Sequence, residues 1–152
     1  MFNHILVAID GSDLGQKAAE MAAELAQKLD SSLTVLHVIP SMLPSTFVDG
    51  MAALSMVDYD SYRGQALQEG EALLRNTVRQ LAYPKTASRL QEAEQGEPVE
   101  KVVLSQANNV HAQLIVLGTH GRGGITRLIL GSVAEGVLRH SSVPVLLIKE
   151  TD

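Results

Sequence analysis

Three glycines and a serine at fixed spacing form the pattern in this sequence that most directly suggests chemistry. Gly118 and Gly121 come first, nine residues follow, and Gly131 and Ser132 complete the set. The set begins where the apolar run 114–117 ends and finishes where a helical pattern starts. Backbone N–H groups in a glycine-rich loop and at a helix N-terminus attract negative charge, because they are unpaired and the helix dipole is positive there. The pattern predicts a phosphate-binding loop, with a tight turn that binds nothing as the alternative.

This loop differs from two common glycine-rich phosphate signatures. A Walker A loop ends in Gly-Lys-Ser or Gly-Lys-Thr, and no lysine follows Gly124 or Gly131. The dinucleotide fingerprint G-x-G-x-x-G lies directly after the first strand of a βαβ unit, where this chain has Asp10 and Gly11 instead. The phosphate hypothesis therefore depends on the position of the loop between a strand and a helix.

Length and composition limit the classes of protein to be considered. With 152 residues, 45% of them hydrophobic and 19% charged, the chain is expected to form a single globular domain over residues 1–152. A net charge of −5 and only five aromatic side chains argue against nucleic acid as a partner. No cysteine is present, which excludes disulfides and thiolate catalysis. The first apolar run ends at Asp10 after five residues, too short for a signal-peptide core or a membrane span, so we expect a cytoplasmic protein without membrane insertion.

Strand and helix patterns alternate along the chain. Apolar runs predict strands at 5–9, 33–39, 114–117 and 143–148, and a weaker pattern that is polar on both faces predicts another at 86–94. Apolar stripes at helical spacing predict helices that begin at Ser12 or Asp13, near Tyr59, after Gly96 with Pro98 in the first turn, and at Ser132. This alternation is typical of an α/β fold: one doubly wound domain with a five-stranded parallel sheet and helices on both faces.

The strand order 3-2-1-4-5 accounts best for the distribution of polar residues. It places the polar third strand, 86–94, at one edge of the sheet. It also makes the first and fourth strands neighbours, so that Asp10 and the loop from Gly118 meet in one crevice. Ligands of such sheets bind beyond the carboxyl ends of the strands, where the strand order reverses.

Two further segments suggest contacts at the surface. Residues 41–58 form a long connection rich in Met and Leu, which is either a surface Ω-loop or a mobile flap beside a ligand or partner. The last strand, 143–148, is wholly apolar, contains Pro144, and lies at an edge without the charges that normally protect one. It predicts a homodimer in which this strand pairs antiparallel with its copy, with coverage by residues 41–58 as the alternative.

The motifs taken together resemble the universal stress protein family. They are the Asp-Gly-Ser at 10–12, the strand end Leu-His-Val at 36–38, G-x2-G-x9-G-S over 118–132, and Val-Pro-Val at 143–145. The resemblance covers nearly the whole chain and implies a flavodoxin-like (Rossmann-like) sheet of order 3-2-1-4-5 in a homodimer. For members with this glycine set it also implies binding of ATP, or of ADP or AMP, with Mg²⁺ on the phosphates.

The resemblance also implies which residues would bind the nucleotide. Gly118 and Gly121 would wrap the ribose and phosphates, Gly131 and Ser132 would hold the outer phosphates, and Val38 would meet the adenine edge. The full implied site comprises Ala8, Ile9, Asp10, Val38, Gly118, Thr119, His120, Gly121, Arg122, Gly131, Ser132 and Val133. No residue is assigned as catalytic or as a direct metal ligand.

Several of these residues have a purely structural alternative. Ser132 and Glu135 match a capping box, in which the hydroxyl would serve its own helix and not a phosphate. Asp10 would either cap the first helix or approach a ribose hydroxyl or Mg²⁺. His120 is interpreted as a hydrogen-bond donor rather than an acid or base, and His37 as a hydrogen-bonded histidine of the core.

The sequence thus predicts an ATP-binding regulator of the stress response, whose nucleotide state sets its choice of an unknown protein partner. Phosphoryl transfer needs a base or water-positioning residue as well as metal ligands and a cation, and no such base is evident. Slow ATP hydrolysis or self-phosphorylation remains the enzymatic alternative. A structural dimer that binds no nucleotide is the third hypothesis.

Overall fold

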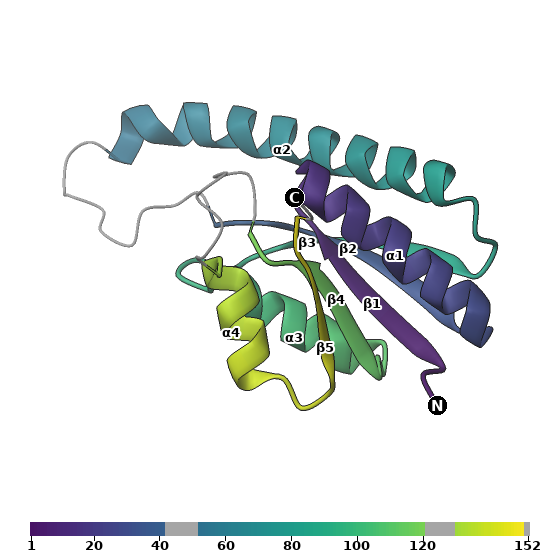
Figure 1. Cartoon of the computed structure of the whole chain (residues 1–152). Helices are drawn as coiled ribbons and strands as arrows, with labels where there is room; N and C mark the ends of the chain where they lie inside the picture. The colour runs from purple at the N-terminus through teal and green to yellow at the C-terminus, as the bar shows by residue number, and fades with distance from the viewer. Residues whose placement is uncertain (42–51, 121–129, 151–152) are drawn as a thin grey trace.

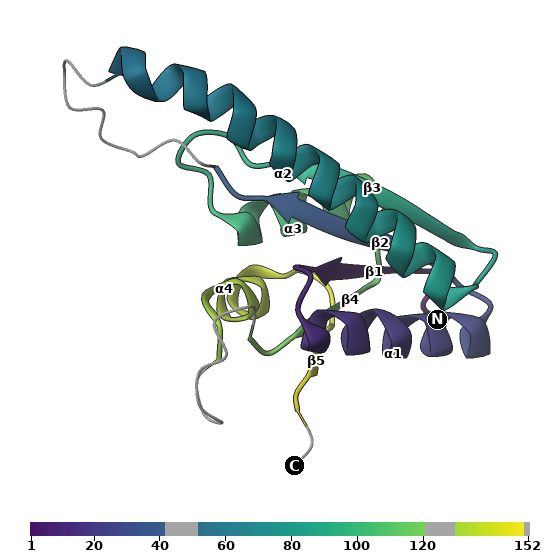
Figure 2. The same cartoon turned by 90° about the horizontal axis from the view of Figure 1, so that it is seen from above.

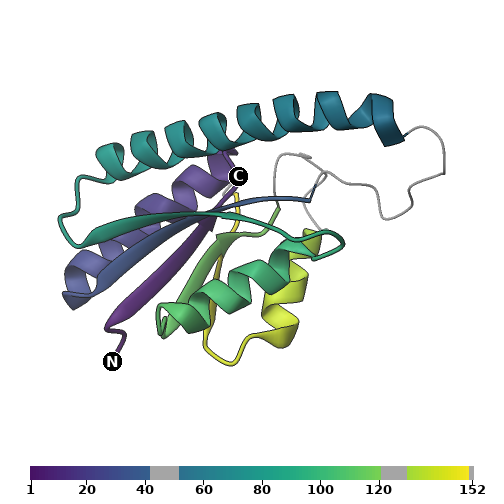
Figure 3. The ribbon, with the colours of Figure 1, turned by 180° about the vertical axis from the view of Figure 1, so that it is seen from behind.

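The computed structural model describes residues 1–41, 52–120 and 130–150. Strands and helices alternate along this chain, with one pair of helices on each face of a central sheet (Figures 1 and 3). The elements are β1 (His4–Ile9), α1 (Asp13–Leu29), β2 (Ser32–Ile39), α2 (Ala52–Leu81), β3 (Thr86–Glu92), α3 (Val99–Asn109), β4 (Leu114–Gly118), α4 (Ser132–His140) and β5 (Val145–Ile148).

The sheet has five parallel strands in the order β3-β2-β1-β4-β5, which confirms the predicted topology. Side chains of β1 alternate between two apolar cores, as the period of a strand requires. Ile5 and Val7 pack with α1 and α2, whereas Leu6 packs with α3 and α4. Burial on both faces explains why the central strands consist of apolar runs.

The strand order reverses between β1 and β4. The chain leaves β1 for α1, which packs on one face of the sheet, and leaves β4 for α4, which packs on the other. The connections that leave these neighbouring strands therefore go to opposite faces of the sheet. A crevice forms between them at the carboxyl ends of β1 and β4, as expected at the switch point of a doubly wound sheet.

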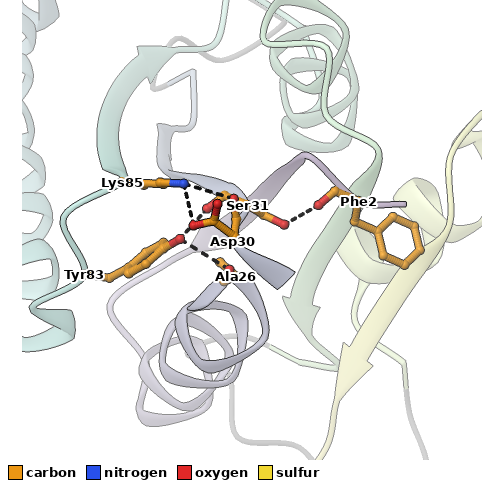
Figure 4. A network of polar contacts seen from close by, with 6 residues as sticks. All are labelled: Phe2, Ala26, Asp30, Ser31, Tyr83 and Lys85. Atoms are coloured by element: carbon orange, nitrogen blue, oxygen red, sulfur yellow. Dashed lines mark hydrogen bonds and ion pairs between the residues drawn. The ribbon is translucent and has the colours of Figure 1, made fainter. Parts of the chain in front are cut away.

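The amino ends of the strands are tied together by a polar network (Figure 4). The Tyr83 hydroxyl donates to the carbonyl oxygen of Ser31 at 2.6 Å, and Lys85 Nζ contacts the Asp30 carboxylate at 2.5 Å. The Ser31 hydroxyl donates to the carbonyl oxygen of Phe2. Because these residues lie just before or at the starts of β1, β2 and β3, the network fixes the end of the sheet opposite the crevice.

Several element boundaries differ from those predicted. Helix α2 begins at Ala52 and not near Tyr59, so the predicted connection over 41–58 is too long at its C-terminal end; residues 42–51 lie outside the described part. The amino-terminal half of α2 extends beyond the sheet (Figure 2). Strand β3 ends at Glu92, and β5 begins at Val145. Pro98 precedes α3 as its N-cap instead of occupying its first turn.

None of the helices in the described ranges combines the length and the apolar character that crossing a membrane requires.

Candidate functional site

The first wall of the site is the turn that follows β1. Gly11 has a φ of 83°, a conformation that L side chains rarely adopt, and Asp10 turns its carboxylate back onto Ser12. Asp10 Oδ1 accepts from the Ser12 backbone nitrogen at 3.0 Å and from the Ser12 hydroxyl at 2.5 Å. The Asp10 side chain is thereby fixed by local bonds of the kind that aspartate makes in turns.

The cap of α1 is Ser12 and not Asp10. Ser12 Oγ accepts from the backbone nitrogen of Gly15 at 3.0 Å, while its own proton is donated to Asp10. The sequence allowed Ser12 or Asp13 as the cap, and Ser12 is confirmed, whereas the alternative that Asp10 itself caps the helix is wrong. Asp10 supports the capping serine through Oδ1.

The second wall is the end of β4. Gly118 is the last residue of this strand, and a Cβ at this position would lie 3.0 Å from Leu14 Cγ of α1. The backbone nitrogen of Thr119 donates to the carbonyl oxygen of Ile148 at 2.8 Å, and the Thr119 carbonyl accepts from Gly131 at 2.7 Å. The hydrogen bond between Thr119 and Gly131 therefore joins the residue that follows β4 to the residue that precedes α4, so the start of α4 lies against the end of the strand.

The third wall is the N-terminus of α4. Gly131 is its N-cap, with φ −63° and ψ 154°, and no side chain caps this end. Ser132 is the first residue of the helix and is exposed, so the structural alternative, a capping box of Ser132 with Glu135, is wrong. The cause is a shift of one residue, because a serine must precede the first helical residue to cap it. The Ser132 hydroxyl is not used in capping α4.

These walls enclose a cavity of about 280 Å³. Ten of the twelve residues implied by the family resemblance line it, namely Ala8, Ile9, Asp10, Val38, Gly118, Thr119, His120, Gly131, Ser132 and Val133. The other two, Gly121 and Arg122, lie outside the described residues.

The cavity has further lining residues that were not predicted. Val99 and Val103 of α3 form an apolar wall near Val38, and Pro40 continues this wall after β2. The remaining additions are Gly15, Leu117 and Ala134. Nothing in the sequence indicated that Val99 and Val103 line a cavity, since the same helical spacing marks a core position and a cavity wall.

The cavity is lined by both polar and apolar side chains. The polar side chains that line it are Asp10, Thr119, His120 and Ser132, and its apolar lining includes Val38, Val99, Val103 and Val133. Thr119 Oγ1 and His120 Nδ1 lie 3.2 Å apart, within hydrogen-bond distance. No group of three or more metal-ligating side chains occurs within the ranges 1–41, 52–120 and 130–150.

The fold and the cavity define a doubly wound α/β protein with a ligand-sized hollow at the switch point of its sheet. The chain belongs to the universal stress protein family, whose model matches residues 1–149. It is 34% identical to the universal stress protein YxiE of Bacillus subtilis, and the alignment covers 98% of this chain and 100% of that protein.

Solved structures share the whole fold. The hypothetical protein MJ0577 superposes with a TM-score of 0.80 at 20% identity, over 100% of this chain and 99% of that one. A universal stress protein from Archaeoglobus fulgidus in complex with dAMP has a TM-score of 0.65 at 23% identity, covering 95% and 96% of the two chains. A universal stress protein in complex with cAMP has a TM-score of 0.64 at 21% identity, covering 97% of each chain.

Proposed function

We propose that this protein is a cytoplasmic regulator of the stress response that binds an adenine nucleotide, ATP in the first place, in the cavity beside β1, β4 and α4. It acts as a homodimer, and the bound nucleotide sets which protein partner it engages. The observation that carries the proposal is that ten residues from four separate parts of the chain line one cavity at the switch point of the sheet.

The residues present fit an adenine nucleotide. Phosphate suits the N-terminus of α4, because Gly131 leaves the first backbone N–H groups of the helix without a side-chain cap. A flat, apolar base suits the wall of Val38, Val99 and Val103. The volume of about 280 Å³ is near the lower end of small-molecule sites, which run from roughly 300 to 1,000 Å³. The dAMP and cAMP complexes of two structural relatives support this choice of ligand class.

Magnesium would enter with the phosphates. Asp10 lines the cavity, and its Oδ1 is engaged with Ser12, which leaves Oδ2 for a cation or a ribose hydroxyl. A single carboxylate is a weak Mg²⁺ site by itself, since this ion is usually held by one or two carboxylates together with substrate phosphates. The ion neutralises phosphate charge that Asp10 would otherwise repel.

Binding without efficient turnover is the form of the proposal that the cavity supports best. Efficient phosphoryl transfer needs a positioned base or water-orienting group beside the terminal phosphate. Asp10 and His120 are the titratable side chains among the described cavity residues, and Asp10 is already bound to Ser12. Retention of the nucleotide, rather than its consumption, then provides the regulatory signal.

The test begins with freshly purified protein. Mass spectrometry of the small molecules released on denaturation identifies any retained nucleotide, and a thermal-melt titration with Mg-ATP measures binding. Ligand at 100 times Kd adds about 2.7 kcal/mol to the free energy of unfolding. Absence of any released nucleotide, of any thermal shift and of any calorimetric signal with ATP, ADP, AMP and cAMP would refute the proposal.

A further inference from the structure

A histidine outside the cavity contacts the backbone that forms its floor. His37 of β2 lies on the face of the sheet that packs with α1 and α2, and its Nδ1 is 2.9 Å from the carbonyl oxygen of Ile9. His37 and Ile9 are the last register pair between β1 and β2. Because a carbonyl oxygen only accepts hydrogen bonds, Nδ1 carries the proton and donates it.

The other side of this imidazole ring meets a glycine of α2. A Cβ on Gly70 would lie 2.7 Å from Leu90 Cδ1, closer than real Cβ atoms approach, and 3.0 Å from His37 Cδ2, which is a tight contact. Gly70 is buried, so the α2 backbone can lie directly against the ring. The ring is therefore confined between the end of β1 and α2, with little freedom to rotate away from Ile9.

The hydrogen bond acts on a peptide unit of the cavity. The Ile9 carbonyl and the Asp10 N–H belong to one planar group, so fixing the direction of the carbonyl also fixes that of the Asp10 nitrogen. Ile9 and Asp10 both line the cavity, whereas His37 does not. Asp10 carries the carboxylate nearest to where the proposed ribose or Mg²⁺ would lie.

We propose that His37 is a positioning residue for the nucleotide site: it orients the Ile9–Asp10 peptide and, through Gly70, ties that peptide to α2. This inference rests on the proposed function. Without the donor, the turn at Asp10 adopts other conformations. The apparent affinity for the nucleotide then falls in proportion to the fraction of molecules that keep the conformation able to bind it. A movement of α2 would shift the His37 ring and, through its hydrogen bond, the Ile9–Asp10 peptide of the cavity.

Three variants of the full chain separate positioning from general destabilisation. His37→Leu removes the donor at similar size, and His37→Asn restores an N–H donor near the place of Nδ1. His4→Leu is the matched control, because His4 Nε2 bonds Thr34 Oγ1 at 2.8 Å at the opposite end of β1. The two leucine variants each lose an internal hydrogen bond, yet only His37→Leu is expected to disturb Asp10.

Calorimetry with Mg-ATP and amide hydrogen exchange at Asp10 and Gly11 in the ligand-free protein give two independent readouts. We expect His37→Leu to bind about fivefold more weakly and to exchange about fivefold faster at these amides, in keeping with the loss of one neutral hydrogen bond. His37→Asn should recover both values to within about twofold, and His4→Leu should lower the melting temperature alone.

The outcomes separate this inference from the proposed function. If the wild type binds no nucleotide, the proposed function fails, and the exchange rates alone decide whether His37 holds the turn. Equal affinity and equal exchange in His37→Leu and wild type would overturn the positioning role. So would a His37→Asn variant that is as impaired as His37→Leu. If the leucine variant does not fold, His37→Asn is compared with wild type, and a loss of affinity and protection well beyond about twofold would overturn the role.

Discussion

Gly15 of α1 lies directly against the carboxylate of Asp10. A Cβ on Gly15 would stand 2.9 Å from Asp10 Oδ1 and 3.3 Å from Ser12 Oγ. The first turn of α1 can therefore approach the end of β1 only because residue 15 has no side chain. A helical glycine thus serves the geometry of the cavity.

Gly15→Ala is predicted to weaken nucleotide binding without unfolding the protein. The new methyl group displaces the Asp10 carboxylate, while alanine itself favours the helix by about 1 kcal/mol over glycine. Calorimetry should show an affinity for Mg-ATP lower by about tenfold, which corresponds to about 1.4 kcal/mol. Gly64→Ala is the control, since a Cβ there meets nothing within 4 Å. Equal affinity in the Gly15 and Gly64 variants would contradict the prediction.

Gly131→Leu is predicted to abolish nucleotide binding in a folded protein. With φ −63° and ψ 154°, residue 131 has a conformation open to any amino acid, so the backbone is not strained. A leucine side chain would occupy the phosphates' approach to α4. Gly118→Val provides a contrast, because its Cβ would press on Leu14 at 3.0 Å and lower stability as well. Thermal melts with and without Mg-ATP check both effects, and a ligand-induced shift of wild-type size in Gly131→Leu would exclude this role.

Ser132→Ala is predicted to lower affinity at unchanged stability. Ser132 does not cap α4, so removing its hydroxyl leaves the helix end as it is. A lost hydrogen bond to a charged phosphate costs about 1.5–3 kcal/mol, or at least about tenfold in affinity. Ser12→Ala is the comparison for stability, because Ser12 does cap α1, and its loss should cost about 1 kcal/mol. A Ser132→Ala protein that melts earlier but binds normally would return the residue to a structural role.

The sheet topology was predictable because its causes are local. Apolar runs that end at Ile9, Ile39 and Leu117 mark strands buried on both faces, and a polar 86–94 segment can only be an edge. These patterns do not fix the strand order, which was preferred because it brings Asp10 to the glycine loop and because the family resemblance implies it. The start of α2 was not predictable in this way, because the residues before Tyr59 mix turn formers with Met and Leu.

The details of the site depend on neighbours that no local pattern reveals. In the sequence, Gly15 and Gly70 look like glycines that merely lower the stability of their helices. In the structure, each lies where another side chain, that of Asp10 or of Leu90, would clash with a Cβ atom. The start of α4 at Ser132 was predicted correctly, and only the alternative in which Ser132 caps this helix is wrong, because Gly131 is the N-cap. His37 was correctly interpreted as a hydrogen-bonded histidine, but its acceptor, Ile9, is 28 residues away in sequence.

Acidification is predicted to destabilise the protein in part through His4. Burial, followed by the positive charges of Arg89 and His111, lowers the pKa of His4 below its ordinary value of 6.5. His4 therefore binds a proton more readily in the unfolded chain than in the folded one. The contribution of neutral His4 to the free energy of unfolding is complete above about pH 6.5 and is lost as the pH falls below that value. Denaturant titrations between about pH 7.5 and 5.5 should show a smaller pH dependence in His4→Leu than in wild type. An identical slope in the two proteins would remove His4 from the explanation.

Among the described residues, β5 is an edge strand with one neighbouring strand, β4, so its other edge could pair with a second copy of the chain. The carbonyl oxygens of Pro144 and Ile148 accept from β4, at 3.0 Å from Ile115 and 2.8 Å from Thr119. Since backbone groups alternate along a strand, the N–H and carbonyl of Leu147 point away from β4. Charged side chains protect most exposed edges, and β5 has none.

Leu147→Pro is therefore predicted to convert a homodimer into a monomer. Proline removes an outward N–H and leaves the hydrogen bonds to β4 in place, which is the situation in which strands tolerate it. Light scattering on a sizing column at high micromolar concentration should give one chain for Leu147→Pro and two for wild type. Tyr62→Lys is the control for removal of exposed apolar surface, because Tyr62 is 61% exposed on α2. A circular-dichroism melt separates dissociation from unfolding, and a wild type that is already monomeric at this concentration would rule out the dimer.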